Sequence, residues 1–75
     1  MVAADYANLV GKAVVAKRWA MTPLEVKFWG VVNVVSDTPG GVDVEFEGGG
    51  GFGITNPSEW TLTIGTSLQA LGVVD

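Results

Sequence analysis

Cysteine and histidine are both absent from this 75-residue sequence. Without cysteine, no disulfide can brace the fold, and thiols give no indication of the redox compartment. Without histidine, the chain lacks the commonest transition-metal ligand and the one side chain that normally titrates near neutral pH. Ser36, Ser58 and Ser67 therefore have no histidine to act as a base, which argues against nucleophilic catalysis. We expect a protein that is not an enzyme and that binds no cofactor and no metal ion.

Charged residues are scarce as well. They make up 16% of the sequence, against about 25% in typical globular proteins, whereas hydrophobic residues make up 48%. A domain this small has a large surface for its volume, so the shortage of charge indicates that part of the surface is covered. We expect a homo-oligomer or a subunit of a larger assembly. The alternative is that glycine, threonine, serine and asparagine cover the outside adequately.

Long apolar runs are missing too. The longest uncharged stretch within the fold, FWGVVNVVS at residues 28–36, is far shorter than the ~20 residues of a membrane-spanning helix. The N-terminal MVAADYANLVG lacks the basic start and the long apolar block of a signal peptide. We therefore expect no membrane contact and a cytoplasmic location.

A strand pattern with a period of two is what the sequence does contain. In VDVEFE, Val42, Val44 and Phe46 alternate with acidic residues, as in a strand with one buried face. Residues 52–54 and 60–64 repeat the alternation and predict two further strands. The side chains predicted to face the core from these two strands are Phe52, Ile54, Trp60, Leu62 and Ile64.

Two more strands are predicted in the first half of the chain. Residues 25–36 are apolar on both faces after residue 28 and contain Gly30, which predicts a long strand bent or bulged at that glycine. The residues predicted to share one face of this strand are Val26, Phe28, Val32 and Val34. Residues 10–19 predict the other strand, with Lys12 and Arg18 pointing outward.

Turn chemistry connects these strands. Pro39 and Gly40 suit the middle of a type II turn. TNPSE at residues 55–59 predicts a turn or a single helical turn, capped by Asn56 or Ser58. Short helical pieces are also predicted near residues 4–9 and at residues 66–72, the latter ending at Gly72.

Read in order, the predicted pieces are LVGKAVVAKRW, a loop, EVKFWGVVNVV, a turn, GVDVEFE, a tight turn, FGI, NPSEW and TLTI. This order over residues 9–64 resembles a Src-homology-3-like small barrel. The resemblance implies a helical turn before the last strand, which is the position of NPSEW here. The ADY at residues 4–6 is too little to carry over the proline-peptide binding of that family. We expect residues 1–75 to form one all-β domain, a five-stranded antiparallel SH3-like barrel with short helical turns.

The chain is also loosely similar to small proteins encoded by actinobacterial phages. That resemblance implies a virion component or an inhibitor of a host protein, located in the virion or the host cytoplasm.

The glycine-rich segment GGGGFG at residues 48–53 has two interpretations, a phosphate-binding loop and a tight turn. A phosphate cradle needs a following helix and often a lysine. Here a strand is predicted on either side, no Lys or Arg follows Lys27, and Glu45 and Glu47 would repel an anion. We therefore predict a β-hairpin whose glycines supply positive φ angles.

Charge is divided along the chain, whose net charge is −4. All four cations lie in residues 1–34, and six of the eight acidic residues follow them. One interpretation is that basic early strands pair beside acidic later strands. The other is a two-signed surface that prefers a basic partner on its acidic side.

Asp43, Glu45 and Glu47 form the predicted acidic strip. Such a row is ordinarily a solvated strand face, and its spacing is too wide for a compact calcium cage. Nucleic-acid binding would instead need a basic stripe with stacking aromatic residues. The closest match to that pattern is Lys12, Lys17, Arg18 and Lys27 near Trp19 and Trp29. Four cations against eight acids suit a phosphate backbone poorly.

The strongest candidate contact surface is aromatic, because Trp29 should face outward if Phe28 faces the core. Aromatic residues, methionine and arginine are enriched at binding surfaces. The predicted partner-binding residues are Trp29, Trp19, Met21, Arg18 and Tyr6. The alternative is that Trp19 and Trp29 close one end of the barrel or are buried in a dimer.

We therefore expect a non-enzymatic protein-protein interaction module. The alternatives are an oligomer that sequesters a small ligand between its subunits and a weak nucleic-acid-binding barrel.

Overall fold

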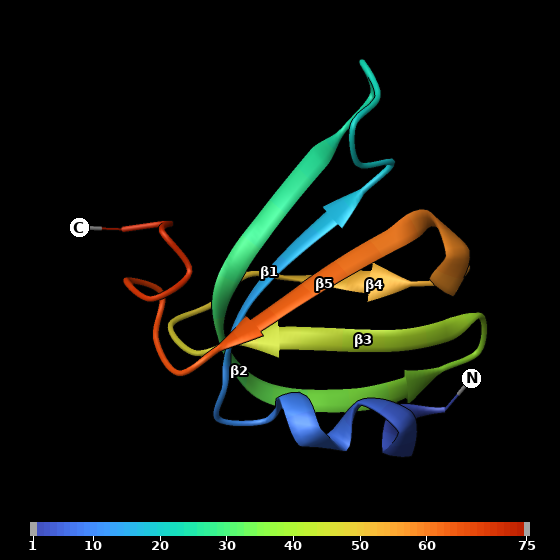
Figure 1. Cartoon of the computed structure of the whole chain (residues 1–75). Coiled ribbons are helices and arrows are strands. Elements are labelled where there is room, and N and C mark those ends of the chain that lie inside the picture. Colours follow the sequence, from blue (N-terminus) through green and yellow to red (C-terminus); the bar gives the residue numbers. More distant parts are fainter. Residues whose placement is uncertain (1, 75) are drawn as a thin grey trace.

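Five antiparallel strands form one curled sheet in the computed structural model, which describes residues 2–74 (Figure 1). The strands are β1 (Ala13–Arg18), β2 (Val26–Thr38), β3 (Gly41–Phe46), β4 (Gly51–Ile54) and β5 (Trp60–Gly65). Their order is β4-β3-β2-β1-β5, so β4 and β5 are the edges of the sheet. Two 3-10 helices, η1 (Ala3–Leu9) and η2 (Pro57–Glu59), complete the fold. The predicted all-β architecture of five strands with short helical turns is confirmed.

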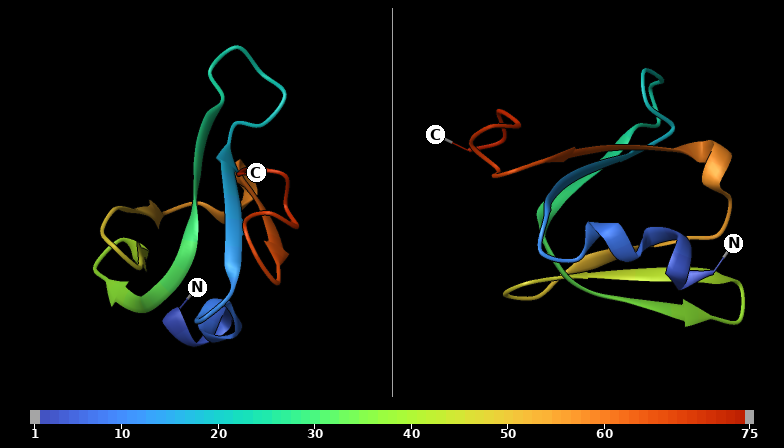
Figure 2. Two further views of the ribbon diagram at one scale, coloured as in Figure 1. Left: turned by 90° about the vertical axis from the view of Figure 1, so that its left-hand side faces the viewer. Right: turned by 60° about the horizontal axis from the view of Figure 1, so that its bottom comes forward.

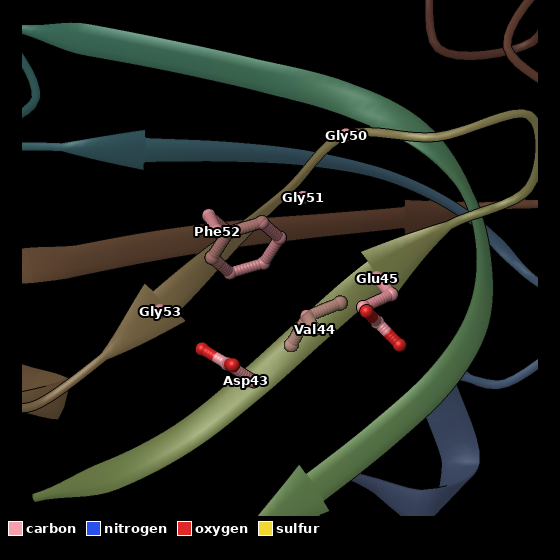
Figure 3. A pocket seen from close by; sticks show the side chains of 7 residues that line it. All are labelled: Asp43, Val44, Glu45, Gly50, Gly51, Phe52 and Gly53. Carbon is pink, nitrogen blue, oxygen red and sulfur yellow. The ribbon is translucent and has the colours of Figure 1, made fainter. Parts of the chain in front are cut away.

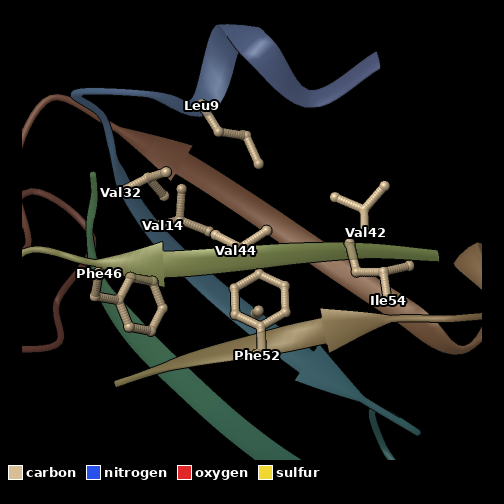
Figure 4. Close-up of a cluster of buried hydrophobic side chains, with 9 residues drawn as sticks. Leu9, Val14, Val32, Val42, Val44, Phe46, Phe52 and Ile54 are labelled. Atoms are coloured by element: carbon tan, nitrogen blue, oxygen red, sulfur yellow. The ribbon is translucent and has the colours of Figure 1, made fainter. Parts of the chain in front are cut away.

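The core lies between the two halves of the curled sheet (Figure 4). Val42, Val44 and Phe46 of β3 are buried while the acidic residues between them are exposed, so the alternation predicted for this strand is confirmed. The buried apolar cluster consists of Leu9, Val14, Ala16, Val32, Val42, Val44, Phe46, Phe52 and Ile54. Burying each of the larger side chains contributes roughly 1.5–3 kcal/mol, and this cluster is the main source of stability in a chain without disulfides.

Aromatic rings bring the two edges of the sheet together. The ring of Phe52 on β4 lies 4.9 Å from that of Trp60 on β5, measured between centroids. Phe28 on β2 lies 6.1 Å from Phe52 and 6.0 Å from Trp60. Aromatic pairs at these distances each add about 0.5–1.5 kcal/mol beyond their buried area. The edge strands therefore approach one another through side chains.

Strand β2 serves both halves of the sheet, and Figure 2 shows it curving from one to the other. The register shifts between Val32 and Val34, which leaves Asn33 as the extra residue of a β-bulge. Beyond the bulge Val35 packs on the core and Val34 is 40% exposed. The prediction that Val34 faces the core with Val32 is therefore wrong, because the bulge reverses the alternation.

Gly30, the predicted site of the bend, has a different role. A Cβ at this position would lie 2.6 Å from Cγ of Phe46, so glycine allows the Phe46 ring to pack directly on the backbone of β2. The long bent strand was predicted correctly, but its irregularity lies at Asn33.

Strand β5 follows the predicted alternation only in part. Trp60 and Leu62 pack against the core, but Ile64 is 44% exposed. Ile64 pairs with Val14 of β1 and has no strand on its other side, because β5 is an edge. The prediction that Ile64 is a core residue is therefore wrong.

The glycine-rich segment is a hairpin between β3 and β4, as predicted. Gly48, Gly49 and Gly50 have φ angles of 81°, 107° and 80°, a region that favours glycine. The Phe46 amide donates a hydrogen bond to the Gly50 carbonyl at 3.0 Å, which closes the turn. The β2–β3 turn differs from its prediction: Gly40 is not among the positive-φ residues, and a type II turn requires positive φ there.

Helical turns occur at the predicted places. η2 separates β4 from β5, and the Asn56 side chain accepts a hydrogen bond from the Ser58 amide at 3.2 Å. η1 lies beneath β2 (Figure 1) and contributes the buried Leu9 to the core. After β5 a single turn ends at Gly72, whose φ is 75°. No helix in the described part of the chain is both long enough and apolar enough to cross a membrane.

Candidate protein-interaction surfaces

The connection between β1 and β2, residues 19–25, projects beyond the rest of the sheet (Figures 1 and 2). We call this segment the hairpin tip. Met21 is 98% exposed and Leu24 is 70% exposed, so two large apolar side chains of the tip lie in water. Scattered apolar residues on a surface are ordinary, but two that are this exposed on one projecting loop leave an apolar area available for contact.

The backbone of the hairpin tip is held in an uncommon conformation. Trp19 and Met21 have φ angles of 54° and 64°, a left-handed region that costs a non-glycine residue roughly 1–3 kcal/mol. The Thr22 hydroxyl donates to the Trp19 carbonyl at 2.6 Å, and the Met21 amide donates to Glu25 Oε1 at 3.3 Å. The Glu25 amide donates to the Thr22 carbonyl at 3.2 Å. These hydrogen bonds hold the tip in one conformation.

Glu59, at the end of η2, anchors the base of the tip. Its Oε1 accepts hydrogen bonds from both Arg18 Nη2, at 2.9 Å, and Arg18 Nε, at 3.3 Å. Its Oε2 accepts one from Trp19 Nε1 at 3.2 Å, and its backbone carbonyl accepts one from the Trp19 amide at 2.9 Å. The Arg18 guanidinium carbon also lies 4.0 Å from the centroid of the Trp19 ring. One carboxylate thus binds Arg18, the last residue before the tip, and Trp19, the first residue of the tip.

The same contacts change the titration of the anchor. The hydrogen bonds from Arg18, and next those from Trp19, lower the pKa of Glu59 below its ordinary value of 4.5, because they favour the charged carboxylate. Glu59 therefore remains ionised, and the tip anchored, at neutral pH.

A second surface lies on the outer face of β1 and β2. Lys17 of β1 is directly opposite Lys27 of β2. The next pair on the same face is Val15 of β1 and Trp29 of β2. Trp29 is 48% exposed, so the prediction that it faces outward is confirmed. Lys27 Nζ lies 5.7 Å from the centroid of the Trp29 ring, within reach of a cation–π contact. We call Lys17, Lys27 and Trp29 the basic face.

The acidic strip occupies the outer face of the other half of the sheet. Asp43 is opposite Gly53, and Glu45 is opposite Gly51. Beside the two carboxylates, β4 therefore presents only glycine backbone on its outer face. The result is a hollow of about 400 Å³ (Figure 3), bounded by Asp43, Glu45 and the glycines of β4. Glu47, just beyond β3, is exposed as well.

The interpretation that basic early strands lie beside acidic later strands holds for β2 and β3, which are neighbours, but their charged side chains do not pair with one another. Lys17 is opposite Lys27, and the β2 residues opposite Asp43 and Glu45 are Ser36 and Val34. The one ion pair within residues 2–74 joins Arg18 to Glu59. The two parts of β2 separate the charges, because residues 26–31 of that strand pair with β1 and the residues from Val32 onward pair with the acidic β3.

A small hollow lies where the edge strands β4 and β5 approach one another. It is lined by Arg18, Val26, Phe28, Phe52, Gly53 and Trp60. Its volume is about 190 Å³, below the ~300–1,000 Å³ of typical ligand pockets. No group of three acidic side chains in the described chain is placed to hold a metal ion.

The structure separates the five predicted partner-binding residues. Met21 and Trp29 are exposed, on the hairpin tip and the basic face respectively. Trp19 is partly buried at the base of the tip, and Tyr6 packs against the core. Arg18 lies on the same side of β1 as the core residues Val14 and Ala16 and is bound to Glu59, so the prediction that it points outward is wrong. Lys12 precedes β1 and is exposed, as predicted.

Sequence reasoning missed Glu59 as an anchor, and it placed Leu24 in or beside the first loop without including it among the predicted partner-binding residues. A hydrogen bond between residues 41 positions apart leaves no local pattern in a sequence. Leu24 had a usable signal, because a leucine directly after a proline in a short loop has little chance of burial.

Comparison with known proteins identifies no relative: no protein-family model, no curated protein and no solved structure matches the chain.

Proposed function

We propose that this protein is a non-enzymatic protein-protein interaction module that contacts its partner through the hairpin tip. The observation that carries the proposal is the exposure of Met21 and Leu24 on a loop whose backbone is already ordered by hydrogen bonds. Covering apolar surface stabilises a complex by roughly 25 cal/mol per Å². A protein that keeps such side chains in water on a projecting loop gains that free energy when a partner covers them.

The order of the tip supports the same proposal. Binding costs conformational entropy when a loop must be fixed, and a loop that is fixed beforehand avoids much of that cost. The positive φ angles of Trp19 and Met21 are maintained by the Glu59 anchor and by Thr22. Strained residues that the surrounding structure holds in place are often found where a protein binds a ligand.

The chemistry of the tip indicates what kind of partner fits. Methionine is unbranched and flexible, so it adapts to an apolar groove, and Leu24 adds a second apolar contact three residues further on. Glu25, whose carboxylate accepts a hydrogen bond from the Met21 amide, provides a charge beside them. We infer a folded protein with an apolar groove rimmed by polar groups. A virion neighbour and a host protein are both consistent with this chemistry.

Binding by variants that introduce a negative charge at the tip tests the proposal. Met21→Asp and Leu24→Asp should each abolish capture of the partner from source cells while the unfolding transition is unchanged, because both side chains are in water. Val10→Asp is the matched control, since Val10 is half-exposed at the η1 end of the molecule, away from the tip. Retention of the partner by both tip variants, or equal loss with Val10→Asp, would contradict the proposal.

A further inference from the structure

We propose that the basic face of one copy of this protein docks on the acidic strip of a second copy. The inference goes beyond the function proposed above, because it uses neither Met21 nor Leu24. Its starting point is the direct opposition of Lys17 and Lys27 across β1 and β2. Like charges directly opposite one another on a sheet are unfavourable, and in the described chain no carboxylate forms an ion pair with either lysine. A carboxylate from another molecule would relieve this repulsion.

The acidic strip supplies the complementary charge. Asp43 and Glu45 lie two residues apart on the exposed face of β3, as Lys27 and Trp29 do on β2. Neither carboxylate forms an ion pair within residues 2–74. Each copy thus carries two surfaces of opposite sign, which adjoin at Gly50 and Gly51 but form no ion pair with each other within residues 2–74.

The shapes are complementary as well. Trp29 projects from the basic face and is half-exposed, while Gly51 and Gly53 leave a hollow beside Asp43 and Glu45. Glycine within a strand marks a bulge, a tight bend, or a site where a ligand or another backbone approaches closely. In the proposed contact the Trp29 indole lies over this bare backbone, and the two lysines reach the carboxylates beside it.

Gly53 indicates that folding alone does not account for the glycines that line the hollow. A Cβ at Gly51 would overlap the carbonyl oxygen of Val44, so glycine is required there. At Gly53, φ is not in the left-handed region, and a Cβ would lie 3.2 Å from Asp43 Oδ1 and at ordinary contact distance, 3.9 Å, from the Val42 carbonyl oxygen. Because the tighter neighbour is an exposed side chain and not backbone, the fold alone does not require glycine at position 53.

Two kinds of assembly satisfy this contact. It closes into a dimer when each copy uses both surfaces on one partner, and it continues into a chain or a ring when each copy binds two partners. In either case we expect the average mass in solution to rise with concentration above that of the monomer.

Sedimentation velocity over a dilution series from about 10 μM to 1 mM tests the contact. Association is expected at about 10 mM salt and should weaken at least tenfold at about 0.5 M salt, because exposed charge pairs are screened. Lys17→Glu should weaken association at least tenfold while the fold is retained, since the substitution converts a like-charge pair into an opposite pair. Lys12→Glu makes the same change of charge before β1, outside the basic face, and should leave association unchanged.

Filling the hollow tests the shape of the contact. Gly53→Val should abolish association and leave the thermal transition unchanged or higher, because valine suits a strand. Gly40→Ala is the matched control, since the only atom near a Cβ there is one methyl carbon, Thr55 Cγ2, at 3.9 Å. Should Gly53→Val unfold the protein, Lys17→Glu still decides the question.

Complementation provides the last arm of the test. Lys17→Glu/Lys27→Glu and Asp43→Lys/Glu45→Lys should each be monomeric alone and should associate when mixed. A monomeric wild type at low salt, equal effects of Lys17→Glu and Lys12→Glu, or failure of the mixture would each overturn the proposal. Binding of a single-stranded oligonucleotide through Trp29 without self-association would also overturn it, in favour of an anionic nucleic-acid partner. Met21→Asp should leave self-association intact, so failure of this contact is distinguishable from failure of the hairpin tip.

Discussion

Arg18 on β1 and Glu59 on η2 are 41 residues apart in the sequence, yet Arg18 Nη2 lies 2.9 Å from Glu59 Oε1. The contact joins the strand that leads into the hairpin tip to the helical turn before the last strand. Because Trp19 donates to the same carboxylate, the orientation of the tip depends on a residue outside it.

Glu59→Gln should therefore loosen the tip. The neutral amide keeps its oxygen acceptor but loses the charge that strengthens the hydrogen bonds from Arg18. We expect a lower thermal transition and faster hydrogen exchange at the amides of Met21 and Leu24. Glu47→Gln is the control, since Glu47 is an exposed acid just beyond β3. Equal behaviour of the two variants would show that the Glu59 contacts do not order the tip.

The Glu59 carboxylate should also make stability depend on pH. Its pKa in the folded protein is lowered from 4.5 by the hydrogen bonds from Arg18 and Trp19, while the unfolded chain keeps the ordinary value. The unfolded state therefore binds the proton more readily, and protonation favours unfolding. This stabilisation is fully present above pH 4.5 and is lost as pH falls through the lower folded pKa.

Thermal unfolding from about pH 3 to pH 7 checks this dependence. The difference in transition temperature between the wild type and Glu59→Gln should be constant near neutrality and shrink below about pH 4.5. A difference that stays the same at acid pH would contradict the assignment of the shift to Glu59.

Two isoleucines in the strands should differ in their contribution to stability. Ile54 is 1% exposed and Ile64 is 44% exposed. Ile54→Val should lower the free energy of unfolding by about 0.5–1.5 kcal/mol, because it leaves a cavity in the core. Ile64→Val should cost no more than a few tenths of a kcal/mol, as at most surface positions. Denaturant unfolding measures both, and similar losses would mean that Ile64 is covered in solution.

Gly51 and Gly53, two residues apart on β4, should respond in opposite ways to alanine. Gly51→Ala should lower the free energy of unfolding by more than about 1 kcal/mol, because the new Cβ overlaps the Val44 carbonyl oxygen. Gly53→Ala should be neutral or stabilise by roughly 0.5–1 kcal/mol, because its backbone suits any residue. A large loss at position 53 would show that the fold itself requires that glycine.

Much of the fold was predictable because buried and exposed residues alternate every second position along β3 and β4. Val42, Val44 and Phe46 face the core as their alternation predicts, and Asn56 caps the helical turn before β5. The hairpin at Gly48–Gly50 was predictable as well, since consecutive glycines suit few other structures.

The errors arose where a non-local feature overrode the local pattern. The bulge at Asn33 reverses the alternation of β2, and nothing in VVNVV indicates it. Ile64 is exposed because β5 is an edge, which depends on the strand order of the whole sheet. The opposition of Lys17 to Lys27 depends on the register of β1 with β2, which the length of the hairpin tip determines.

Photo-crosslinking from position 21 is the most direct test of the central claim, that the hairpin tip contacts a protein partner. A photoreactive residue replacing Met21 should form one dominant crosslink to a different protein in source cells. The same residue at position 10 should not form this crosslink. Crosslinks that are equally abundant from both positions, or that are absent from position 21 while the partner still co-purifies, would contradict the claim.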